Sequence, residues 1–386
     1  MPRLLMVATV PRTLRLFLFP LARFFQAKGW RVDAAANGVT SARDCVEVFD
    51  EVRDIEWSRN PLDPRNLRTG PRMIRAVVAH GKYDVVHVHT PVAALVTRYA
   101  LKGLAAKDRP VVVYTAHGFH FHAGGNPFRN QVFRTLEKLA GRWTDYLIVM
   151  NEDDEAEARK LGIVPADRLR YMRGIGIDTD FYAPQQVSEA SVKAVRDELR
   201  LPGEAPMILM VAEFNPGKRH VDALRAFARI YRDSALHLVF VGEGPLRSSM
   251  ERLAADLGIS ERCRFLNERW DIPVMIRASV ATLLPSVREG LPRCVMESMC
   301  LERPVIGSDV RGIRELLGDG AGILVKARDV DGFADAMKLV LEHPEAAQAM
   351  ADLGRKRMQG PYELSSILSA HLDLYEEALA RRVTGT

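Results

Sequence analysis

The chain has 386 residues, of which 47% are hydrophobic and 27% are charged, a balance typical of a folded protein large enough for two domains. Its four cysteines include no Cys-x-x-Cys pair, which argues against a structural zinc site or a disulfide framework and favours a reducing cytoplasm. The formal net charge of +5, with many arginines in the first half, suits an anionic substrate or an anionic membrane surface, although a solvated basic face has the same composition.

The first residues predict a buried strand rather than a signal peptide. A short apolar run begins at Leu4 and is followed at once by Pro11 and Arg12, with no longer apolar region or small-residue cleavage site. The next apolar stretch, residues 14–25, is interrupted by arginines and a proline and is far shorter than the roughly 20 residues that span a bilayer. It is either an amphipathic helix that touches lipid or a core helix packed on a sheet.

Short apolar strands alternate with helical patterns along the whole chain. In the first half they are predicted over residues 3–10, 30–36, 83–90, 110–118 and 145–151. The pattern restarts after about residue 183, with strands over residues 207–214, 236–242, 263–267, 280–286 and 303–309. Continuous apolar strands between helices indicate parallel sheets covered on both faces. We therefore predict two doubly wound α/β domains, residues 1–182 and 183–362, that face one another across a cleft.

Open parallel sheets bind ligands beyond the carboxyl ends of their strands, and histidines lie there in the first half. His87 and His89 end one predicted strand, and His117, His120 and His122 follow the next. Such imidazoles can bind a metal, but no carboxylate ligand is evident nearby, so a polar end to a buried strand is the simpler interpretation of His87 and His89. A glycine follows His117 and permits close approach of a ligand, which predicts this imidazole at the mouth of the cleft.

In the second half, a cationic turn lies between a predicted strand and a predicted helix. It contains Gly217, Lys218 and Arg219. A helix start offers backbone N–H groups and the positive end of the helix dipole, so two cations there predict a phosphate site. A solvated Lys-Arg pair is the alternative. The spacing of a Walker motif is absent.

Residues 240–247 match part of a dinucleotide-binding fingerprint. Gly242 and Gly244 fit its first two glycines, but Arg247 stands where the third belongs, and no acidic residue occupies the ribose position. We therefore reject an NAD site and keep Gly242 as a candidate contact for a nucleotide.

The segment SVREGLPRCVMESMC, residues 286–300, carries two glutamates. Glu289 lies in the loop after a predicted strand, Pro292 suits the first turn of the next helix, and Glu297 lies within that helix among apolar residues. Gly290 and Leu291 can offer backbone N–H groups to an oxyanion. A carboxylate can accept hydrogen bonds from the paired hydroxyls of a ribose, as we predict for Glu297, or from a sugar, as we predict for Glu289. Two solvated helix charges are the alternative.

These features together resemble the retaining glycosyltransferases of family four, and the match covers nearly the whole chain. Its most specific part is the Glu-x7-Glu element within residues 285–317, supported by VFVGEGPLR, GIGIDTDFY, YDVVHVHTP and YTAHGFHFHAGG. The opening LLMVATV and the segment HTPVAALVTRYAL are most similar to the bacterial branch that builds capsule, exopolysaccharide and O-antigen units. The resemblance implies the GT-B fold, with a C-terminal helix of about residues 363–386 packed back onto the first domain.

The resemblance also implies a role for each candidate residue. Glu289 contacts the donor sugar, Lys218 holds the diphosphate, and His117 faces the donor sugar from the first domain. The residues expected to hold the nucleotide are Glu297 at the ribose, Gly290 and Leu291 through backbone N–H groups, Arg219 and Gly242.

Two positions depart from the family pattern. The family commonly has a Gly-Arg pair after the strand at residues 207–211, with the arginine on the diphosphate, whereas this chain has Ala212 and Glu213. The glycine-rich turn after the first strand is replaced by VPRTLR. Phosphate charge must then rest more heavily on Lys218.

The implied function is retaining transfer of a hexose or N-acetylhexosamine from a nucleotide diphosphate sugar, with UDP as the expected nucleotide, to a lipid-linked saccharide in bacterial surface polysaccharide synthesis. We expect no metal, no other cofactor and no nucleic-acid partner. We expect a cytoplasmic enzyme with peripheral contact to an anionic membrane. Two alternatives stay open: a UDP-sugar 2-epimerase of the same fold, and a non-catalytic nucleotide-sugar-binding scaffold.

Overall fold

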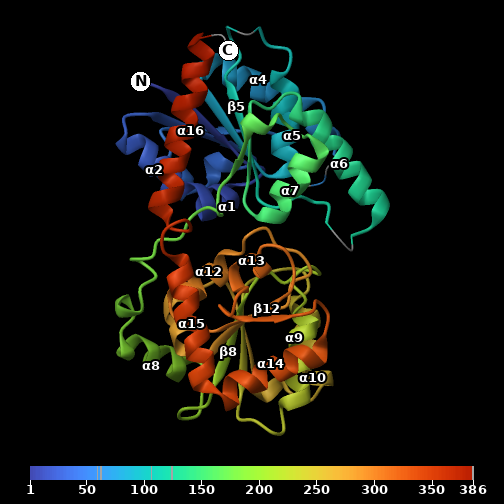
Figure 1. The fold of residues 1–386 in the computed structure, drawn as a ribbon, viewed down its shortest axis with the longest axis vertical. Helices are drawn as coiled ribbons and strands as arrows, with labels where there is room; N and C mark the ends of the chain where they lie inside the picture. The colour runs from blue at the N-terminus through green and yellow to red at the C-terminus, as the bar shows by residue number, and fades with distance from the viewer. Residues whose placement is uncertain (59, 61–62, 106, 123–124, 385–386) are drawn as a thin grey trace. The chain divides into compact units, whose positions relative to one another are not determined.

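The chain forms two compact units in a computed structural model that describes all residues except 59, 61–62, 106, 123–124 and 385–386 (Figure 1). One unit consists of Met1–Ile175 with Ser365–Thr386, and the other of Gly176–Leu364. The sequence places the boundary after residue 182, whereas the structure places it after residue 175. The intervening residues join the second unit because the N–H of Ile177 donates to the carbonyl of Tyr362 and the N–H of Leu364 donates to the carbonyl of Ile177, both at 2.9 Å.

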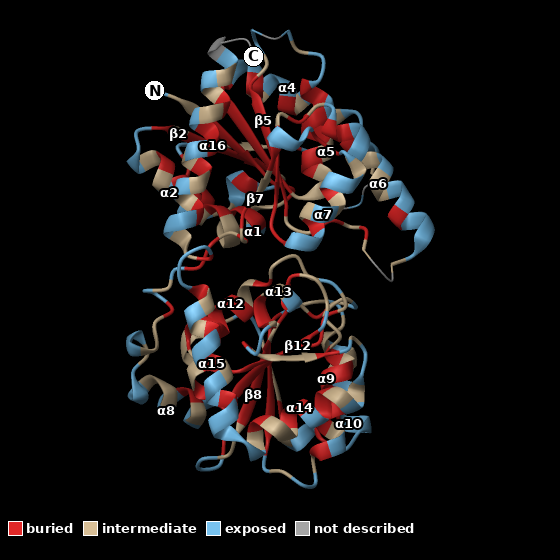
Figure 2. Cartoon of the chain, in the orientation of Figure 1, coloured by how far each residue is buried: buried red, intermediate tan, exposed pale blue. Residues whose placement is uncertain are grey.

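The first unit contains a parallel sheet of seven strands in the order β3-β2-β1-β4-β5-β6-β7. The strands are β1 (Arg3–Val7), β2 (Arg31–Ala36), β3 (Glu51–Asp54), β4 (Val85–His89), β5 (Val111–Ala116), β6 (Tyr146–Val149) and β7 (Leu169–Tyr171). The central strands are buried along their length, as expected for a sheet covered on both faces (Figure 2). The chain order reverses between β1 and β4, which makes the carboxyl ends of these two strands the topological switch point.

Helices on both faces of this sheet come from the segments between the strands. They are α1 (Pro11–Thr13), a π-helical turn (Leu14–Leu18), α2 (Phe19–Ala27), α3 (Arg43–Val48), α4 (Thr69–Gly81), α5 (Pro91–Leu101), α6 (Pro127–Gly141) and α7 (Glu152–Leu161). In the apolar N-terminal stretch, Leu14, Leu18, Leu21 and Phe25 are buried in the core. The structure therefore gives this stretch the core role. In the part of the chain that the structure describes, no helix combines the length and apolarity needed to cross a membrane.

The last helix, α16 (Leu364–Thr384), packs against the first unit. Tyr375 is fully buried there, with its ring stacked on Phe25 at a centroid distance of 4.8 Å. Arg170, from β7, donates from one guanidinium nitrogen to both carboxylate oxygens of Glu377 at 2.8 Å. This helix is coloured red beside the blue α2 in Figure 1.

The second unit contains a parallel sheet of six strands in the order β10-β9-β8-β11-β12-β13. The strands are β8 (Met207–Val211), β9 (His237–Val241), β10 (Cys263–Leu266), β11 (Ala281–Leu284), β12 (Val305–Ser308) and β13 (Ile323–Val325). The helices are α8 (Glu189–Glu198), α9 (His220–Ile230), α10 (Arg247–Asp256), α11 (Ile272–Ala278), α12 (Arg293–Cys300), α13 (Ile313–Leu317), α14 (Val330–Glu342) and α15 (Pro344–Met358). Here the order reverses between β8 and β11, so the loops after these strands flank the switch point.

Candidate functional site

The loop after β8 is a tight turn that presents Lys218. The side chain of Asn215 accepts hydrogen bonds from the backbone N–H groups of Gly217 and Lys218, at 3.0 and 3.2 Å. Arg219 follows in the left-handed region, at φ 58°, and α9 begins at the next residue. This turn places Lys218 at the carboxyl end of β8, as the sequence predicts.

Lys218 and Glu289 form an ion pair across the switch point. The ammonium nitrogen of Lys218 lies 2.6 Å from Oε1 of Glu289, and both side chains are largely shielded from solvent. The backbone N–H of Val287 also donates to the carbonyl of Gly217 at 3.0 Å, which ties the loop after β11 to the loop after β8. Burial favours the neutral form of Lys218, but the charge and hydrogen bond of Glu289 outweigh it and raise the pKa of Lys218. The lysine is therefore a cation at neutral pH.

Arg219 is held by a different carboxylate. Its Nε and Nη2 donate to the two oxygens of Asp222, both at 2.7 Å, and Asp222 is buried in the first turn of α9. Sequence reasoning did not identify this pair, although the i,i+3 spacing on a helix is a usable signal. Both cations of the turn thus have acidic partners.

Glu297 is buried on α12 and held by two side chains. It is 7% exposed. Its Oε1 accepts a hydrogen bond from the hydroxyl of Tyr182 at 2.7 Å and lies 2.8 Å from Nε of Arg293. Burial raises the pKa of Glu297, against the opposing effect of Arg293. Neither partner was singled out from the sequence. The i,i+4 spacing points to Arg293, whereas Tyr182 lies in a distant segment.

Helix α12, which carries Glu297, follows the loop that carries Glu289. Cys294 lies one turn before Glu297 on α12, and burial raises the pKa of its thiol to about 12. The charges of Lys218, Glu289 and Glu297 all act on this thiol. The structure therefore brings Lys218 and Glu289 into contact and places Glu297 on the adjoining helix, and their common role in one site stays a prediction.

Gly290 and Leu291 lie before helix α12. The N-cap residue is Pro292, which the sequence placed in the first turn, so these two residues precede the cap instead of adjoining the first turn. A neighbouring loop fixes them: Nε of Arg311 donates to the carbonyl of Glu289 at 3.3 Å, and a Cβ at Gly312 would lie 1.7 Å from the carbonyl oxygen of Gly290. This loop follows β12 and was not predicted as part of the site.

Close packing requires a glycine at position 242. Its φ is 149°, and a Cβ there would lie 2.2 Å from the carbonyl oxygen of Ala212. The loop after β9 presses on the loop after β8, where the N–H of Phe214 donates to the carbonyl of Glu243 at 2.8 Å. Contact of Gly242 with a nucleotide stays a prediction.

Glu213 adds negative charge at the same end of β8. It is half-buried, and its charge acts on Lys218 in the direction that raises the lysine pKa. Where the family pattern has an arginine, this chain therefore has a second carboxylate near the cation of the turn.

The first unit holds a row of histidines at the ends of β4 and β5. Nδ1 of His89 lies 3.1 Å from Nε2 of His117, and both nitrogens of His87 are hydrogen-bonded. Burial holds the pKa values of His87 and His89 well below the ordinary range and lowers that of His117 to about 4. Among the described residues, no three His, Cys, Asp or Glu side chains form a group able to hold a metal ion.

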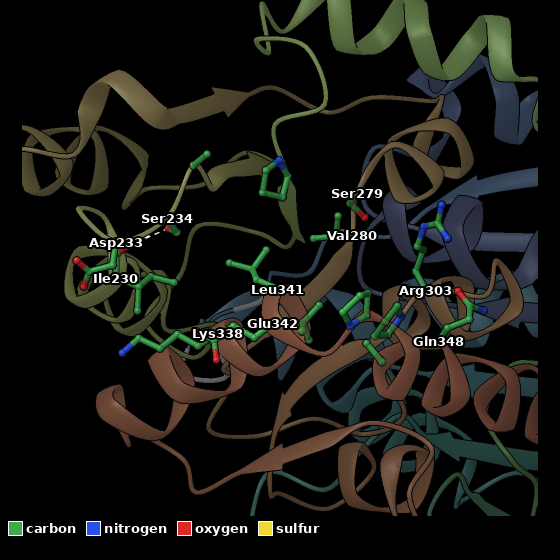
Figure 3. A pocket seen from close by; sticks show the side chains of 16 residues that line it. Ile230, Asp233, Ser234, Ser279, Val280, Arg303, Lys338, Leu341, Glu342 and Gln348 are labelled. Atoms are coloured by element: carbon green, nitrogen blue, oxygen red, sulfur yellow. Dashed lines mark hydrogen bonds between the residues drawn. The ribbon is translucent and has the colours of Figure 1, made fainter.

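A cavity of about 530 Å³ lies at the opposite edge of the second sheet (Figure 3). Its lining includes Pro206, Val280 and Pro304, which directly precede β8, β11 and β12. The candidate residues follow these strands instead. This cavity is thus separate from the site around Lys218.

Solved structures define the fold class. The chain aligns over 98% of its length with all of Anabaena HepE in complex with UDP and glucose, at a TM-score of 0.81 and 17% identity. It aligns equally well with the sucrose-phosphate synthase of Thermosynechococcus elongatus, covering 98% of this chain and 100% of that one, at a TM-score of 0.81 and 19% identity. The fold is the GT-B fold of glycosyltransferases.

Sequence comparison gives the family. One family model, described as Glycosyltransferase Family 4, matches residues 17–181, and another, described as Glycosyl transferases group 1, matches residues 191–357. EpsD of Bacillus subtilis (strain 168), itself assigned to the glycosyltransferases, is 33% identical over 381 residues, covering 96% of this chain and 97% of EpsD. The chain belongs to glycosyltransferase family 4. An Escherichia coli relative, 27% identical over 78% of this chain and 77% of its own, is a UDP-Gal:alpha-D-GlcNAc-diphosphoundecaprenol alpha-1,3-galactosyltransferase.

Proposed function

We propose that this glycosyltransferase moves a hexose or N-acetylhexosamine, with retention of anomeric configuration, from a UDP-sugar to a lipid-linked saccharide in bacterial surface polysaccharide synthesis. The observation that carries the proposal is the Lys218–Glu289 pair beside buried Glu297, at the switch point of the second sheet. The Escherichia coli relative, whose described activity uses a UDP-sugar and a diphosphoundecaprenol-linked sugar, supports the donor and acceptor classes.

In this proposal, each residue acts on one part of the donor. Lys218 holds the diphosphate, Glu289 accepts hydroxyls of the sugar, and Glu297 accepts hydroxyls of the ribose. Arg219, Gly242 and the backbone of Gly290 and Leu291 help hold the nucleotide, and His117 of the first unit contacts the sugar. Glu297 suits its role because Tyr182 and Arg293 already fix its carboxylate.

The chemistry requires stabilisation of negative charge on the departing nucleoside diphosphate. Glu289 keeps Lys218 protonated, so a full positive charge is present before the donor bond breaks. Loss of one such group typically raises the barrier by about 3–4 kcal/mol in other enzymes. We propose that Lys218 and the starts of α9 and α12 supply this charge without a divalent metal. The outgoing phosphate takes the acceptor proton on the same face, so the glutamates need not act as the acid and base of a glycosidase.

We also propose that the enzyme is cytoplasmic and binds an anionic membrane through α6. Phe128, Val132 and Leu139, here called the α6 stripe, are 78%, 41% and 42% exposed. At about 100° per residue they share one face within roughly 40°, and exposed Arg129 and Lys138 flank them. An apolar stripe between cations fits the surface of an anionic bilayer. The N-terminal stretch that the sequence offered for this contact is instead committed to the core.

The proposed roles of Lys218 and Glu289 are tested with two variants. We expect Lys218→Ala and Glu289→Ala to lower donor turnover by about 100-fold or more, because each removes a group that binds the diphosphate or the sugar. Turnover is measured as released nucleotide with a panel of UDP- and GDP-sugars. Asp331→Ala is the matched control, since it breaks the exposed Arg229–Asp331 pair of the same unit. Wild-type turnover in both site variants, with the fold retained, contradicts the roles.

A further inference from the structure

His89 is a buried histidine with no role in the proposed function. It ends β4 at the switch point of the first sheet and is 2% exposed. Its Nδ1 lies 3.1 Å from Nε2 of His117. Its Nε2 is buried and has no hydrogen-bond partner among the described residues.

The two histidines near His89 direct ring nitrogens at other groups. Nδ1 of His87 lies 2.5 Å from the hydroxyl of Tyr375, and Nε2 of His87 lies 2.7 Å from the hydroxyl of Thr115. Both nitrogens of that ring are therefore engaged. His371 directs its Nδ1 at the carbonyl of Ile367, 2.7 Å away on its own helix. No hydrogen bond joins either of these imidazoles to Nε2 of His89.

The hydrogen bond between His89 and His117 allows two proton arrangements. Burial keeps both rings neutral, and a neutral imidazole carries one N–H. If His117 donated from Nε2, the proton of His89 would sit on Nε2 as a buried N–H without an acceptor. If His89 donates from Nδ1, only a lone pair is left without a partner. Orphaned buried N–H groups are rarer in proteins than under-satisfied acceptors, which favours the second arrangement.

We propose that His89 is a positioning residue that fixes His117 in the tautomer with its proton on Nδ1. His117 then presents an N–H donor, and its preferred ligand is an acceptor such as a sugar hydroxyl or a phosphate oxygen. Nδ1 of His117 has no hydrogen bond within the described part of the chain, and its ring is stacked on Phe17 at 5.3 Å, which holds its orientation. The link to the donor sugar rests on the proposed function, but the tautomer does not.

The tautomer is measured directly by nitrogen NMR of the whole chain labelled at histidine. At neutral pH we expect His117 and His89 each to show a protonated Nδ1 and a bare Nε2. His89→Asn and His117→Gln assign the signals. A protonated Nε2 in wild-type His117 overturns the inference. This measurement needs no substrate, so it stands even if no nucleotide-sugar is turned over.

Substitution separates a positioning role from a packing role. In His89→Asn the amide nitrogen is as many bonds from Cα as Nδ1 and can donate in its place. His89→Leu fills similar space without a donor. We expect His89→Asn to keep the Nδ1–H form of His117 and donor kcat/KM within about threefold, and His89→Leu to mix the tautomers and lower kcat/KM about tenfold or more, an effect of one hydrogen bond. His80→Leu, at an exposed histidine of α4, is the control. An unchanged tautomer in His89→Leu contradicts the proposal.

Discussion

At the scale of single residues, the site differs from the family pattern in its balance of charge. Lys218 faces Glu289 at 2.6 Å and also experiences the charge of Glu213. Arg219 is committed to Asp222. A diphosphate that enters this site therefore meets cations that already have carboxylate partners, which predicts modest affinity for the nucleotide alone.

Restoring the family's cation is expected to tighten nucleotide binding. Glu213→Arg removes a carboxylate and adds a donor suited to phosphate, and a hydrogen bond to a charged group contributes about 1.5–3 kcal/mol. We expect the Kd for UDP, measured by titration calorimetry, to fall about tenfold or more, with Glu213→Gln intermediate. Asp331→Arg makes the same change of charge at an exposed position of the same unit. An unchanged or weaker affinity in Glu213→Arg would show that position 213 does not face the phosphates.

Sequence reasoning could predict which residues form the site but not how each is held. Lys218 and Glu289 follow β8 and β11, so strand prediction alone places them at one sheet edge. The i,i+4 spacing predicts Arg293 beside Glu297. The hydroxyl of Tyr182 cannot be predicted in this way, because Tyr182 and Glu297 are 115 positions apart. The same limit applies to Gly312, whose need for a glycine appears only when its loop meets Gly290.

At the scale of elements, periodicity predicted the central strands because each is a short apolar run bounded by polar residues. Periodicity could not decide whether the segment before β2 contacts lipid or packs in the core, because an amphipathic helix shows the same pattern in both settings. Tertiary packing decided the matter: Leu14 and Phe25 are fully buried. Likewise, the sequence predicts polar residues at the end of β4 but not the partner of His87. Its hydrogen bond to Tyr375 joins residues 288 positions apart, which no local pattern can show.

Helix α6 carries the prediction that belongs to this scale. Burying one aromatic side chain contributes about 1.5–3 kcal/mol, so we expect Phe128→Glu with Val132→Glu to weaken binding to vesicles rich in phosphatidylglycerol by at least about tenfold. Binding is measured by co-sedimentation at low salt. Leu353→Glu alters an exposed apolar residue of α15 and is the control. Equal sedimentation of wild type and the α6 variant, or none for either, would contradict membrane contact through this stripe.

At the scale of the whole molecule, the chain combines two parallel sheets whose switch points carry different kinds of side chain. The second unit gathers ionised groups around its switch point, and the first gathers neutral imidazoles near its own. Membership of family 4 identifies the molecule as a glycosyltransferase. The choice of donor, the stereochemistry of transfer and the source of positive charge depend on the residues of this particular chain.

The central claim is metal-independent, acceptor-dependent transfer with retention. It is tested most directly by a proton NMR time course of a turned-over UDP-sugar with a lipid-linked saccharide acceptor, in the presence of EDTA. The account predicts a product anomeric signal of the same configuration as the donor, at an undiminished rate, and no change in the donor sugar when the acceptor is left out. Conversion of the UDP-sugar to its 2-epimer without acceptor, inversion at the anomeric carbon, or activity lost in EDTA and restored by one divalent ion would contradict it.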